Sequence, residues 1–516
     1  MSQADLRAGD AVLRLDNITK RFGALVANSG VSLDLKRGEV VALLGENGAG
    51  KTTLMNILFG HYQADEGRVE VFGQTLPPGN PRAALAAGVG MVHQHFTLAD
   101  NLSVLDNITL GTESLWSRGK GRFAARARIA ALSSEFGLAV DPDARVGSLS
   151  VGERQRIEIL KALYREARIL ILDEPTAVLT PQETDALFDT LRKAIALGLS
   201  IIFISHKLHE VMAIADRCVV LRHGKVVGQV ETHATDRAAL AAMMVGSAVA
   251  LPKVETRPAG PVLMRLSNVT TRAKGTATGL SDLSLDLCAG QIVGLAGVSG
   301  NGQAALADLI SGLVRPDQGW IEIDGAEPAA WSPRQAVNHQ IARIPEDRHK
   351  TGTVSDFNLT ENAVLEAYSR PPFSRHGWMN WPAAQSFAKE VIAKYDVRCQ
   401  GVLQRIRLLS GGNMQKLILG RVLEPGPKII LANQPVRGLD VGAIAYVQSR
   451  LIAARDAGAA VLLISEDLDE IQSLSDVIHV ISEGRLSPGF SRGSKTAAEL
   501  GLWMAGQGFR VGDHAA

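Results

Sequence analysis

The chain contains an internal repeat, and this duplication constrains its fold more than any other feature. The segment VSLDLKRGEVVALLGENGAGKTTL, which starts at Val31, aligns with LSLDLCAGQIVGLAGVSGNGQAAL, which starts at Leu283, at an offset of 252 residues (283 − 31). Later segments align at an offset of 260 residues (409 − 149), LSVGERQR with LSGGNMQK and ISHKLHE with ISEDLDE. The second copy has therefore gained eight residues between Gln94 and Leu149 of the first copy, in a region that we expect to be peripheral.

The repeat and the chain length predict two domains, because 516 residues exceed what a single hydrophobic core usually holds. We expect domain 1 at residues 1–248, a linker at residues 249–262 and domain 2 at residues 263–516. The junction, SAVALPKVETRPAGPV, is rich in proline and small residues, as linkers are. In each copy, apolar runs such as EVVALLG and RILILDE alternate with helical patterns, which predicts an α/β fold with a mostly parallel sheet flanked by helices.

Composition and charge narrow the class of protein. Hydrophobic residues make up 46% and charged residues 21% of the chain, as in soluble globular proteins. The net charge of +1 provides no strong field for binding nucleic acid or anionic lipid. The three cysteines lie far apart and fit no metal spacing, so we interpret them as thiols in a reducing compartment. No apolar run approaches 18 residues and the first residues do not resemble a signal peptide, so we expect the chain in the cytosol and any membrane role through a partner.

The first copy contains a phosphate-binding motif. GENGAGKT, from Gly45 to Thr52, follows a predicted strand and precedes a predicted helix, which is the context that this motif requires. Glycines in such a loop let backbone N–H groups surround phosphate oxygens, and the helix N-terminus adds partial positive charge. The lysine places a cation on the outer phosphates, and the threonine hydroxyl can reach Mg²⁺. The expected nucleotide-binding residues are Gly45, Asn47, Gly48, Gly50, Lys51, Thr52 and Thr53.

Two adjacent carboxylates follow a later buried strand of the first copy. Asp173 ends the apolar run ILIL and is suited to holding Mg²⁺, and Glu174 beside it can orient and deprotonate an attacking water. Taken alone, such a pair is equally compatible with an ordinary polar strand end. The phosphate motif earlier in the same copy favours the interpretation that these two carboxylates belong to a nucleotide site.

The order of motifs in each copy resembles that of the ATP-binding cassette (ABC) family, and the chain is identified as a member of it across nearly its whole length. The series is the phosphate loop, Gln94 in VGMVHQHF, LSVGERQR, ILILDEP and His206 in IFISH. The resemblance implies two P-loop domains, each with a helical signature subdomain. It further implies that Gln94 contacts Mg²⁺ and couples the nucleotide to a transmembrane partner, that His206 senses the terminal phosphate, and that Phe22 stacks on adenine. The alternative for Phe22 is an ordinary core aromatic.

The second copy has lost the chemistry of this site. The residues that stand at the cation, metal-ligand, general-base, sensor and coupling positions are Gln303, Ala304, Asn433, Gln434, Glu466 and Glu346. Removing a general base alone typically lowers a rate by about two to four orders of magnitude. We therefore predict negligible hydrolysis at this pocket, while nucleotide binding stays open because the glycines of GVSGNGQA survive.

The family resemblance also implies a composite site, because cassette dimers sandwich each nucleotide between the phosphate loop of one domain and the signature of the other. The pocket of domain 1 would then be completed by Ser410, Gly411 and Gly412 of LSGGNMQK. The degenerate pocket would receive LSVGERQR, in which Val151 replaces a glycine. On this interpretation the second copy keeps the parts needed by its neighbour and has lost those needed for its own pocket.

MVHQHF, the EILKALYR segment and IPEDRHKTG together resemble the ATPase subunits of bacterial nucleoside importers, which are related to simple-sugar (ribose-type) importers. This likeness implies ATP and Mg²⁺, two permease subunits, an extracytoplasmic solute-binding lipoprotein, no nucleic acid, and a place on the cytoplasmic face of the inner membrane. A sugar importer is the alternative. A soluble twin-cassette factor acting on ribosomes is disfavoured by the charge of +1 and the degenerate second site. A non-catalytic module is disfavoured by the intact residues of the first copy.

Overall fold

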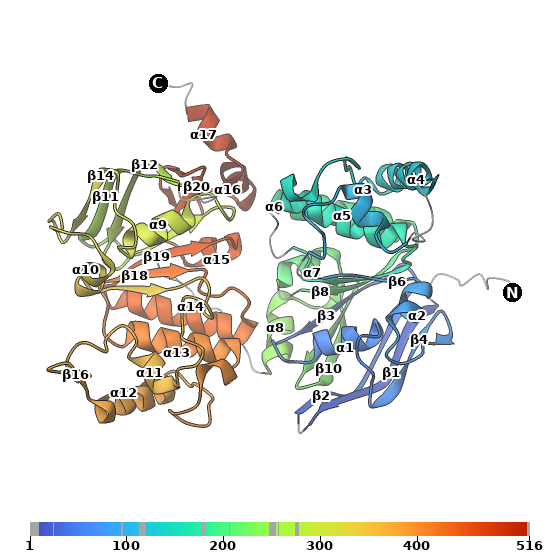
Figure 1. Cartoon of the computed structure of the whole chain (residues 1–516), viewed down its shortest axis with the longest axis horizontal. Helices are drawn as coiled ribbons and strands as arrows, with labels where there is room; N and C mark the ends of the chain where they lie inside the picture. The colour runs from blue at the N-terminus through green and yellow to red at the C-terminus, as the bar shows by residue number, and fades with distance from the viewer. Residues whose placement is uncertain are drawn as a thin grey trace. The chain divides into compact units, whose positions relative to one another are not determined.

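The computed structural model describes residues 10–512, except residues 24, 94–95, 113–119, 177–178, 180, 206, 247–253, 256 and 274–277. Two of the predicted catalytic residues, Gln94 and His206, lie outside the described residues. The chain divides near residue 250 into two compact units, called domain 1 and domain 2 below (Figure 1).

The main sheet of domain 1 has six strands in the order β10-β9-β3-β8-β7-β6. All neighbours are parallel except the edge strand β10, which runs antiparallel to β9. All six residues of β3 are buried, as expected for an apolar run covered on both faces of a parallel sheet. The strands are β3 (Val40–Gly45), β6 (Val89–Val92), β7 (Ile169–Asp173), β8 (Ser200–Ile204), β9 (Arg217–Arg222) and β10 (Lys225–Glu231).

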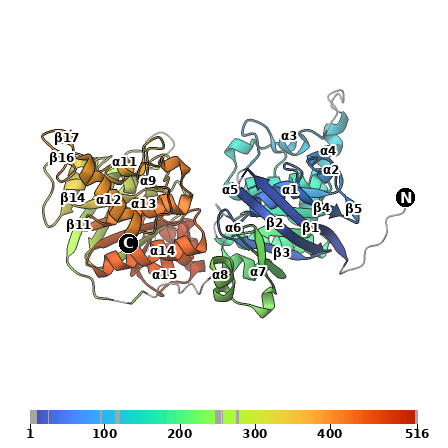
Figure 2. The ribbon, with the colours of Figure 1, turned by 90° about the horizontal axis from the view of Figure 1, so that it is seen from below.

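A second, antiparallel sheet of domain 1 has the order β2-β1-β4-β5, and Figure 2 shows its two long paired strands, β1 and β2. Its strands are β1 (Ala11–Phe22), β2 (Leu25–Lys36), β4 (Glu66–Val71) and β5 (Gln74–Thr75). One apolar core lies between this sheet, the main sheet and helix α1, and another lies on the opposite face of the main sheet beneath α5 and α6. The main sheet is therefore covered on both faces.

The helices of domain 1 complete these layers, and α3, α4 and α5 pack against one another as a helical subdomain (Figure 1). The α-helices are α1 (Lys51–Leu58), α2 (Pro81–Ala86), α3 (Val104–Thr109), α4 (Lys120–Phe136), α5 (Val151–Tyr164), α6 (Pro181–Ala196), α7 (Leu208–Ile214) and α8 (Arg237–Val245). Two short 3₁₀ helices span Val146–Ser148 and Thr232–Ala234. Of the described residues, no helix is long and apolar enough to cross a membrane.

Domain 2 repeats this architecture. Its main sheet has the order β15-β18-β19-β13-β20-β21, with β22 also paired to β20, and its antiparallel sheet has the order β12-β11-β14. The strands are β11 (Val262–Thr271), β12 (Leu280–Cys288), β13 (Ile292–Ala296), β14 (Gln318–Ile323), β15 (Ile341–Ile344), β16 (Ser374–Arg375), β17 (Trp378–Met379), β18 (Ile429–Asn433), β19 (Ala460–Ser465), β20 (Val477–Ser482), β21 (Arg485–Leu486) and β22 (Phe490–Ser491). The predicted α/β class is therefore confirmed in both halves.

The α-helices of domain 2 follow the same order, with α16 corresponding to α8 at the offset of 260 residues, and α17 is the one additional α-helix among the described residues. They are α9 (Gln303–Ile310), α10 (Pro333–Asn338), α11 (Leu359–Ala363), α12 (Trp381–Lys394), the 3₁₀ helix Ile406–Leu408, α13 (Gly411–Leu423), α14 (Val441–Asp456), α15 (Leu468–Leu474), α16 (Ala497–Met504) and α17 (Gln507–Gly512).

The structure locates the eight additional residues of the second copy. The isolated bridge between Ser103 and Arg145 has its counterpart between Asn358 and Arg405. The offset is 255 at the first members of these bridges (358 − 103) and 260 at the second (405 − 145). Three residues are therefore inserted soon after Glu346 and five within the helical subdomain, where the β16–β17 hairpin lies. Both insertions leave the central sheet intact, which agrees with the predicted peripheral region.

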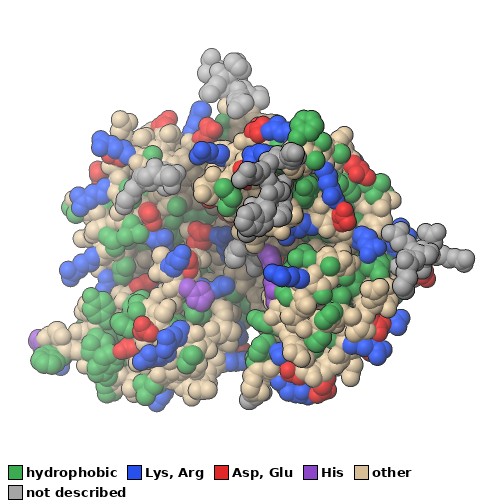
Figure 3. Space-filling view, turned by 45° about the vertical axis from the view of Figure 1, so that its right-hand side comes forward, with side chains coloured by type: hydrophobic (Ala, Val, Ile, Leu, Met, Phe, Trp, Pro, Cys, Tyr) green, Lys and Arg blue, Asp and Glu red, His purple; other side chains and the backbone are tan. Residues whose placement is uncertain are grey.

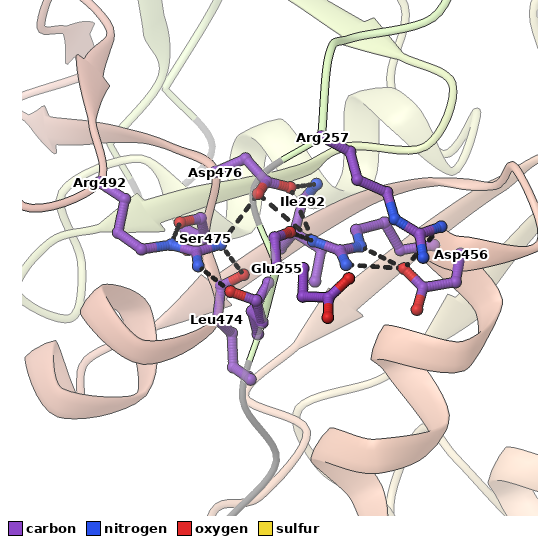
Figure 4. Close-up of polar contacts among 10 residues, drawn as sticks. Glu255, Arg257, Ile292, Asp456, Leu474, Ser475, Asp476 and Arg492 are labelled. Carbon is purple, nitrogen blue, oxygen red and sulfur yellow. Dashed lines mark hydrogen bonds and ion pairs between the residues drawn. The ribbon is translucent and has the colours of Figure 1, made fainter.

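Val254 and Glu255, which precede β11, are held by two arginines of domain 2, Arg455 and Arg492, and Figure 4 labels Arg492, Glu255 and Asp476 of this group. Arg455, only 1% exposed, donates from its guanidinium to the Glu255 carbonyl at 3.1 Å. Arg492 donates to the Val254 carbonyl at 2.6 Å. Both guanidinium groups also contact Asp476, at 3.3 and 2.8 Å respectively. Val254 and Glu255, which the sequence assigned to the linker, are thus attached to domain 2.

This arginine pair distinguishes the two halves. At the offset of 260 residues, Arg455 and Arg492 replace Ile195 and Thr232 of domain 1. Asp476 and its counterpart Asp216 make the same contact in each domain, because each accepts a hydrogen bond from the first residues of the central strand. The contact of this aspartate is therefore shared, and in domain 2 two arginines at these positions bind the preceding segment.

Charged side chains of both signs are interspersed on the face drawn in Figure 3. This distribution matches the net charge of +1 and gives that face no large area of a single sign.

Candidate functional site

The phosphate loop of domain 1 connects the end of β3 to the start of α1. Its glycines have backbone conformations that other residues adopt only with strain: φ is 150° at Gly45, 83° at Gly48 and 101° at Gly50. A Cβ atom at Gly45 or at Gly50 would lie 2.3 Å from a backbone carbonyl oxygen. The tight loop that surrounds a phosphate therefore depends on these glycines.

Lys51 begins α1 and turns back over this loop. Its Nζ atom donates to the carbonyl oxygens of Gly45 at 2.6 Å and Glu46 at 3.1 Å. Burial lowers the pKa of Lys51, while the nearby charges of Glu174 and Asp173 raise it. The lysine thus keeps a cation at the phosphate loop and next to the acidic pair. Thr52, Thr53 and Asn47 lie in or beside the loop, and the side chain of Thr52 is exposed.

The two carboxylates of domain 1 lie at the carboxyl end of β7, the second strand along from β3. Burial raises the pKa of Asp173 to about 6, the charge of Glu174 adds to this rise, and Lys51 opposes it. Glu174 has a positive φ of 48°, an uncommon conformation for a residue with a side chain. Its N–H donates to the Ile204 carbonyl on β8 at 2.9 Å, which holds this turn against the sheet.

These residues fit a magnesium ion shared with a bound phosphate. The described residues contain no group of three or more His, Cys, Asp or Glu side chains that could hold a metal ion by themselves. Mg²⁺ usually takes one or two protein oxygens and completes its shell with phosphate oxygens and water. Asp173 and the Thr52 hydroxyl offer oxygen ligands of this kind, and the raised pKa of Asp173 reflects mainly the burial of its carboxyl group.

Phe22 ends β1 and is 44% exposed, so the alternative interpretation of it as a core aromatic was wrong. Its ring contacts the ring of Tyr62 edge-to-face, with the centroids 5.6 Å apart. Pattern analysis missed Tyr62, because the residue belongs to no motif and meets Phe22 only through the fold.

The second phosphate loop keeps its shape and is closed by its own glutamine. Gly300 and Gly302 have φ values of 90° and 114°, close to those of Gly48 and Gly50. Gln303, only 9% exposed, donates from Nε2 to the Val298 carbonyl at 2.8 Å. Its Oε1 atom accepts the N–H of Asn301 at 3.0 Å. A neutral amide therefore takes the place of the lysine and uses an N–H group of the loop.

The acidic pair is replaced in domain 2 without a change in backbone. Asn433 ends β18 and is buried, and Gln434 has a φ of 50°, matching Glu174. The N–H of Gln434 donates to the Ile464 carbonyl at 2.8 Å, as Glu174 does to Ile204. At the coupling position, Glu346 forms an ion pair with Arg437. The sensor position, Glu466, is partly buried.

The two signature loops differ at their helix caps. Ser150 caps α5 in a capping box, where Glu153 accepts hydrogen bonds from both the Ser150 amide and its hydroxyl, each at 2.8 Å. Ser410 caps α13, and the residue at the equivalent position is Asn413, whose amide donates to the Ser410 hydroxyl at 2.9 Å. A helix N-terminus favours an anion, and a resident carboxylate competes with an incoming phosphate. The signature of domain 2, which contains Gly411 and Gly412, therefore lacks the capping carboxylate that Glu153 provides in domain 1.

Arg348 lies in the inserted loop after Glu346 and was missed by sequence reasoning. It donates to the carbonyl oxygens of Arg437 at 3.0 Å and Gly438 at 3.4 Å. Its guanidinium also lies beside Gly411, where a Cβ atom would come within 3.2 Å of it. It links the segment after β18 to the start of the signature helix and adds a positive charge there.

The comparisons with known proteins agree with this architecture. The ABC transporter family matches residues 28–177 and 280–437, which together make up more than half of the chain. The chain therefore belongs to the ABC transporter family. The predicted family and the tandem arrangement are confirmed, and ATP binding follows from them.

Relatives align along nearly the whole chain. The nucleoside import ATP-binding protein NupA of Lactococcus lactis is 44% identical over 97% of this chain and 99% of its own length. The guanosine import ATP-binding protein NupO of Bacillus subtilis is 44% identical over 96% and 97%. The glucose import ATP-binding protein TsgD13 of Haloferax volcanii is 41% identical over 96% of both chains.

A solved structure also matches most of the chain. The archaeal ribosome recycling factor aABCE1, in complex with a ribosomal stalk protein, superposes with a TM-score of 0.64 over 95% of this chain and 92% of its own. Its sequence identity of 17% shows a shared fold only.

Proposed function

We propose that this chain is the ATP-hydrolysing subunit of a bacterial importer that takes up nucleosides through partner permeases. The asymmetry between the two pockets carries this proposal. Domain 1 combines the phosphate loop, the Lys51 cation and two carboxylates, whereas domain 2 has Gln303, Asn433 and Gln434 at those positions. The relatives named for nucleoside and guanosine import support the substrate class.

In the proposed reaction, the loop and Lys51 bind the phosphates of ATP at domain 1. Glu174 accepts a proton from water as the water oxygen bonds to the terminal phosphorus, and the bond from that phosphorus to the bridging oxygen breaks to release ADP. Asp173, Thr52 and Gln94 would hold Mg²⁺, which when bound offsets phosphate charge. His206 would contact the terminal phosphate.

We further propose that the signature of domain 2 completes this site. Ser410, Gly411 and Gly412 would contact the terminal phosphate of the ATP held by domain 1. The absence of a capping carboxylate at Asn413 and the positive charge of Arg348 support this role. Two permease subunits and an extracytoplasmic solute-binding lipoprotein would complete the importer, with this chain bound to the permeases at the cytoplasmic face of the inner membrane.

Uptake measurements test this function. A strain lacking the protein should lose uptake of labelled guanosine and other nucleosides, and expression of the protein should restore it. Glu174→Gln should fail to restore uptake, whereas the matched change in the other half, Gln434→Glu, should restore it fully. Nucleoside uptake that persists without the protein would refute the proposal.

Import of a simple sugar is the second candidate. The relative named for glucose import is 41% identical, and relatives named for ribose import are 37% identical. Loss of labelled ribose or glucose uptake in the same strain, with nucleoside uptake retained, would establish this alternative.

A further inference from the structure

Two exposed aromatic side chains of domain 1 are held in fixed positions. Phe22 and Tyr62 are 44% and 42% exposed, yet their rings pack edge-to-face. The Nζ atom of Lys20 lies over the Phe22 ring, 5.4 Å from its centroid, and forms a 2.9 Å ion pair with Asp65. Large aromatic surfaces are usually buried, so an exposed pair held by such contacts indicates a surface that binds a ligand.

The aromatic pair lies close to the phosphate loop. Phe22 pairs with Leu25 at the end of the β1–β2 hairpin. Two residues further along β2, the Ala27 carbonyl would lie 2.3 Å from a Cβ atom at Gly50, and Asn28 donates to the Gly50 carbonyl at 3.2 Å. Because a strand advances about 3.3 Å per residue, Phe22 lies roughly 7–10 Å along the strand from this contact. A ribose can bridge that gap between phosphates and base.

Domain 2 lacks the first member of the pair. The arginine before each position donates its backbone N–H to an equivalent aspartate, Arg21 to Asp65 at 2.6 Å and Arg272 to Asp317 at 2.8 Å. These matched hydrogen bonds align Phe22 with Ala273. The alanine offers no ring on which a base could stack.

Domain 2 also lacks the second member. Tyr62 donates its N–H to the Asn56 carbonyl at 3.0 Å, and Val314 donates to the Asp308 carbonyl at 3.3 Å. The donor lies six residues after the acceptor in both domains, which aligns Tyr62 with Val314. Both aromatic residues therefore occur only in the half that carries Lys51 and the carboxylates.

We propose that Tyr62 is a positioning residue of a nucleobase site, where it fixes the plane of the Phe22 ring on which the base stacks. This inference rests on the proposed function of domain 1 as the ATP site. The Nζ atom of Lys20 lies over the Phe22 ring and Tyr62 meets that ring edge-to-face, so the plane of the ring is held from two sides. Fixing the ring before the nucleotide arrives reduces the entropy lost on binding. Stacking uses the flat face that every base has, so the affinities for ATP and for GTP should depend on Tyr62 to the same extent.

The experiment compares full-length Tyr62→Ala, Tyr62→Phe and the matched control Val314→Ala. Measurements are the Kd for ATP and GTP, competition by inorganic tripolyphosphate, and the kcat and KM of ATP turnover. Tyr62→Ala should raise the Kd and KM for both nucleotides about three- to tenfold, the range of one edge-to-face aromatic contact. Tripolyphosphate affinity and kcat should not change, because neither involves the base. Tyr62→Phe should behave as the unaltered protein, and so should Val314→Ala.

A double variant tests whether Tyr62 acts through Phe22. Phe22→Ala with Tyr62→Ala should bind ATP no more weakly than Phe22→Ala alone. Additive losses, an equal loss for tripolyphosphate, or an unchanged Kd in Tyr62→Ala would overturn the inference. If Lys51→Ala leaves ATP affinity intact, the proposed function of domain 1 fails. If binding requires Lys51 but ignores Tyr62, only this inference fails.

Discussion

The buried carboxyl of Glu470 predicts that domain 2 loses stability as the pH rises through the neutral range. Glu470 is 3% exposed in α15. Burial raises its pKa to about 8, and the charge of Asp467 adds to the rise. Ser465 and Gln448 oppose the rise, but no described residue completes a hydrogen bond to either carboxyl oxygen. The side chain is therefore protonated in the folded state at neutral pH.

The equivalent residue of domain 1 explains how this carboxyl became isolated. Glu210 accepts hydrogen bonds from Thr176 at 2.6 Å and Ser205 at 2.9 Å, and Lys207 lies 3.4 Å from its other oxygen. At the offset of 260 residues, the threonine is replaced by Val436 and the lysine by Asp467. Domain 2 has kept the buried acid while losing a donor and exchanging a cation for an anion.

The magnitude follows from the two pKa values. Below pH 4.5 the carboxyl is neutral in both the folded and the unfolded chain. Between pH 4.5 and about 8 the unfolded chain releases the proton and the folded domain keeps it, so each pH unit lowers the free energy of unfolding by about 1.4 kcal/mol. The full window amounts to roughly 5 kcal/mol. This value is an upper bound, because local opening that admits water to the carboxyl group would limit the loss of unfolding free energy.

Urea unfolding between pH 6 and 9 tests this account. Five of the six tryptophans, at positions 320, 331, 378, 381 and 503, lie in domain 2, so tryptophan fluorescence follows its unfolding. Glu470→Gln should flatten the dependence on pH between 6 and 8 and be the more stable protein at pH 9. Restoring the partners of domain 1 with Val436→Thr and Asp467→Lys should flatten it as well. If Glu470→Gln loses stability with pH as steeply as the unaltered protein, the reasoning is refuted.

Two further predictions concern the paired sites, and a third concerns the segment before β11. Glu174→Gln should lower ATP turnover by about two to four orders of magnitude, and Gln303→Lys should leave turnover unchanged in a phosphate-release assay, because the second pocket would still lack its carboxylates. Ser410→Ala should lower the rate of ATP turnover at saturating ATP. Ser150→Ala should leave that rate unchanged and cost only about 0.5–2 kcal/mol of helix-cap stability. Equal turnover rates in the two variants would contradict the composite site. Arg455→Met should release the segment before β11, so limited proteolysis should cut near residue 255 faster than in the unaltered protein while nucleotide binding at domain 1 stays the same.

Sequence reasoning predicted those parts of the site whose chemistry is local. The phosphate loop, Lys51 and the pair Asp173 and Glu174 were recognisable because a strand, a glycine turn and a helix must follow each other in order. The α/β fold was predictable for a similar reason, since continuous apolar runs are typical of strands buried on both faces.

The contacts that the sequence did not reveal join distant segments. Arg348 reaches carbonyl groups about 90 residues away, and Tyr62 meets Phe22 across 40 positions (62 − 22). The attachment of Glu255 and Val254 to domain 2 was hidden for the same reason, because Arg455 and Arg492 bind their carbonyl groups from 200 and 238 residues further along the chain, respectively. Gln303 could be recognised as a lost cation, but its use as an internal partner of the loop needed the folded geometry.

The pattern of change between the halves indicates why the second one persists. Domain 2 has replaced the side chains that would meet a nucleotide, yet it keeps the positive φ at Gln434 and the glycine conformations at Gly300 and Gly302. A positive φ at a residue with a side chain costs of order 1–3 kcal/mol. A domain without a function would have no reason to keep this unfavourable conformation. The retained turn at Gln434 leads directly into Arg437 and Gly438, whose carbonyl oxygens hold Arg348 beside the signature. The scaffold of a lost catalytic turn therefore supports the loop that we propose the active pocket requires.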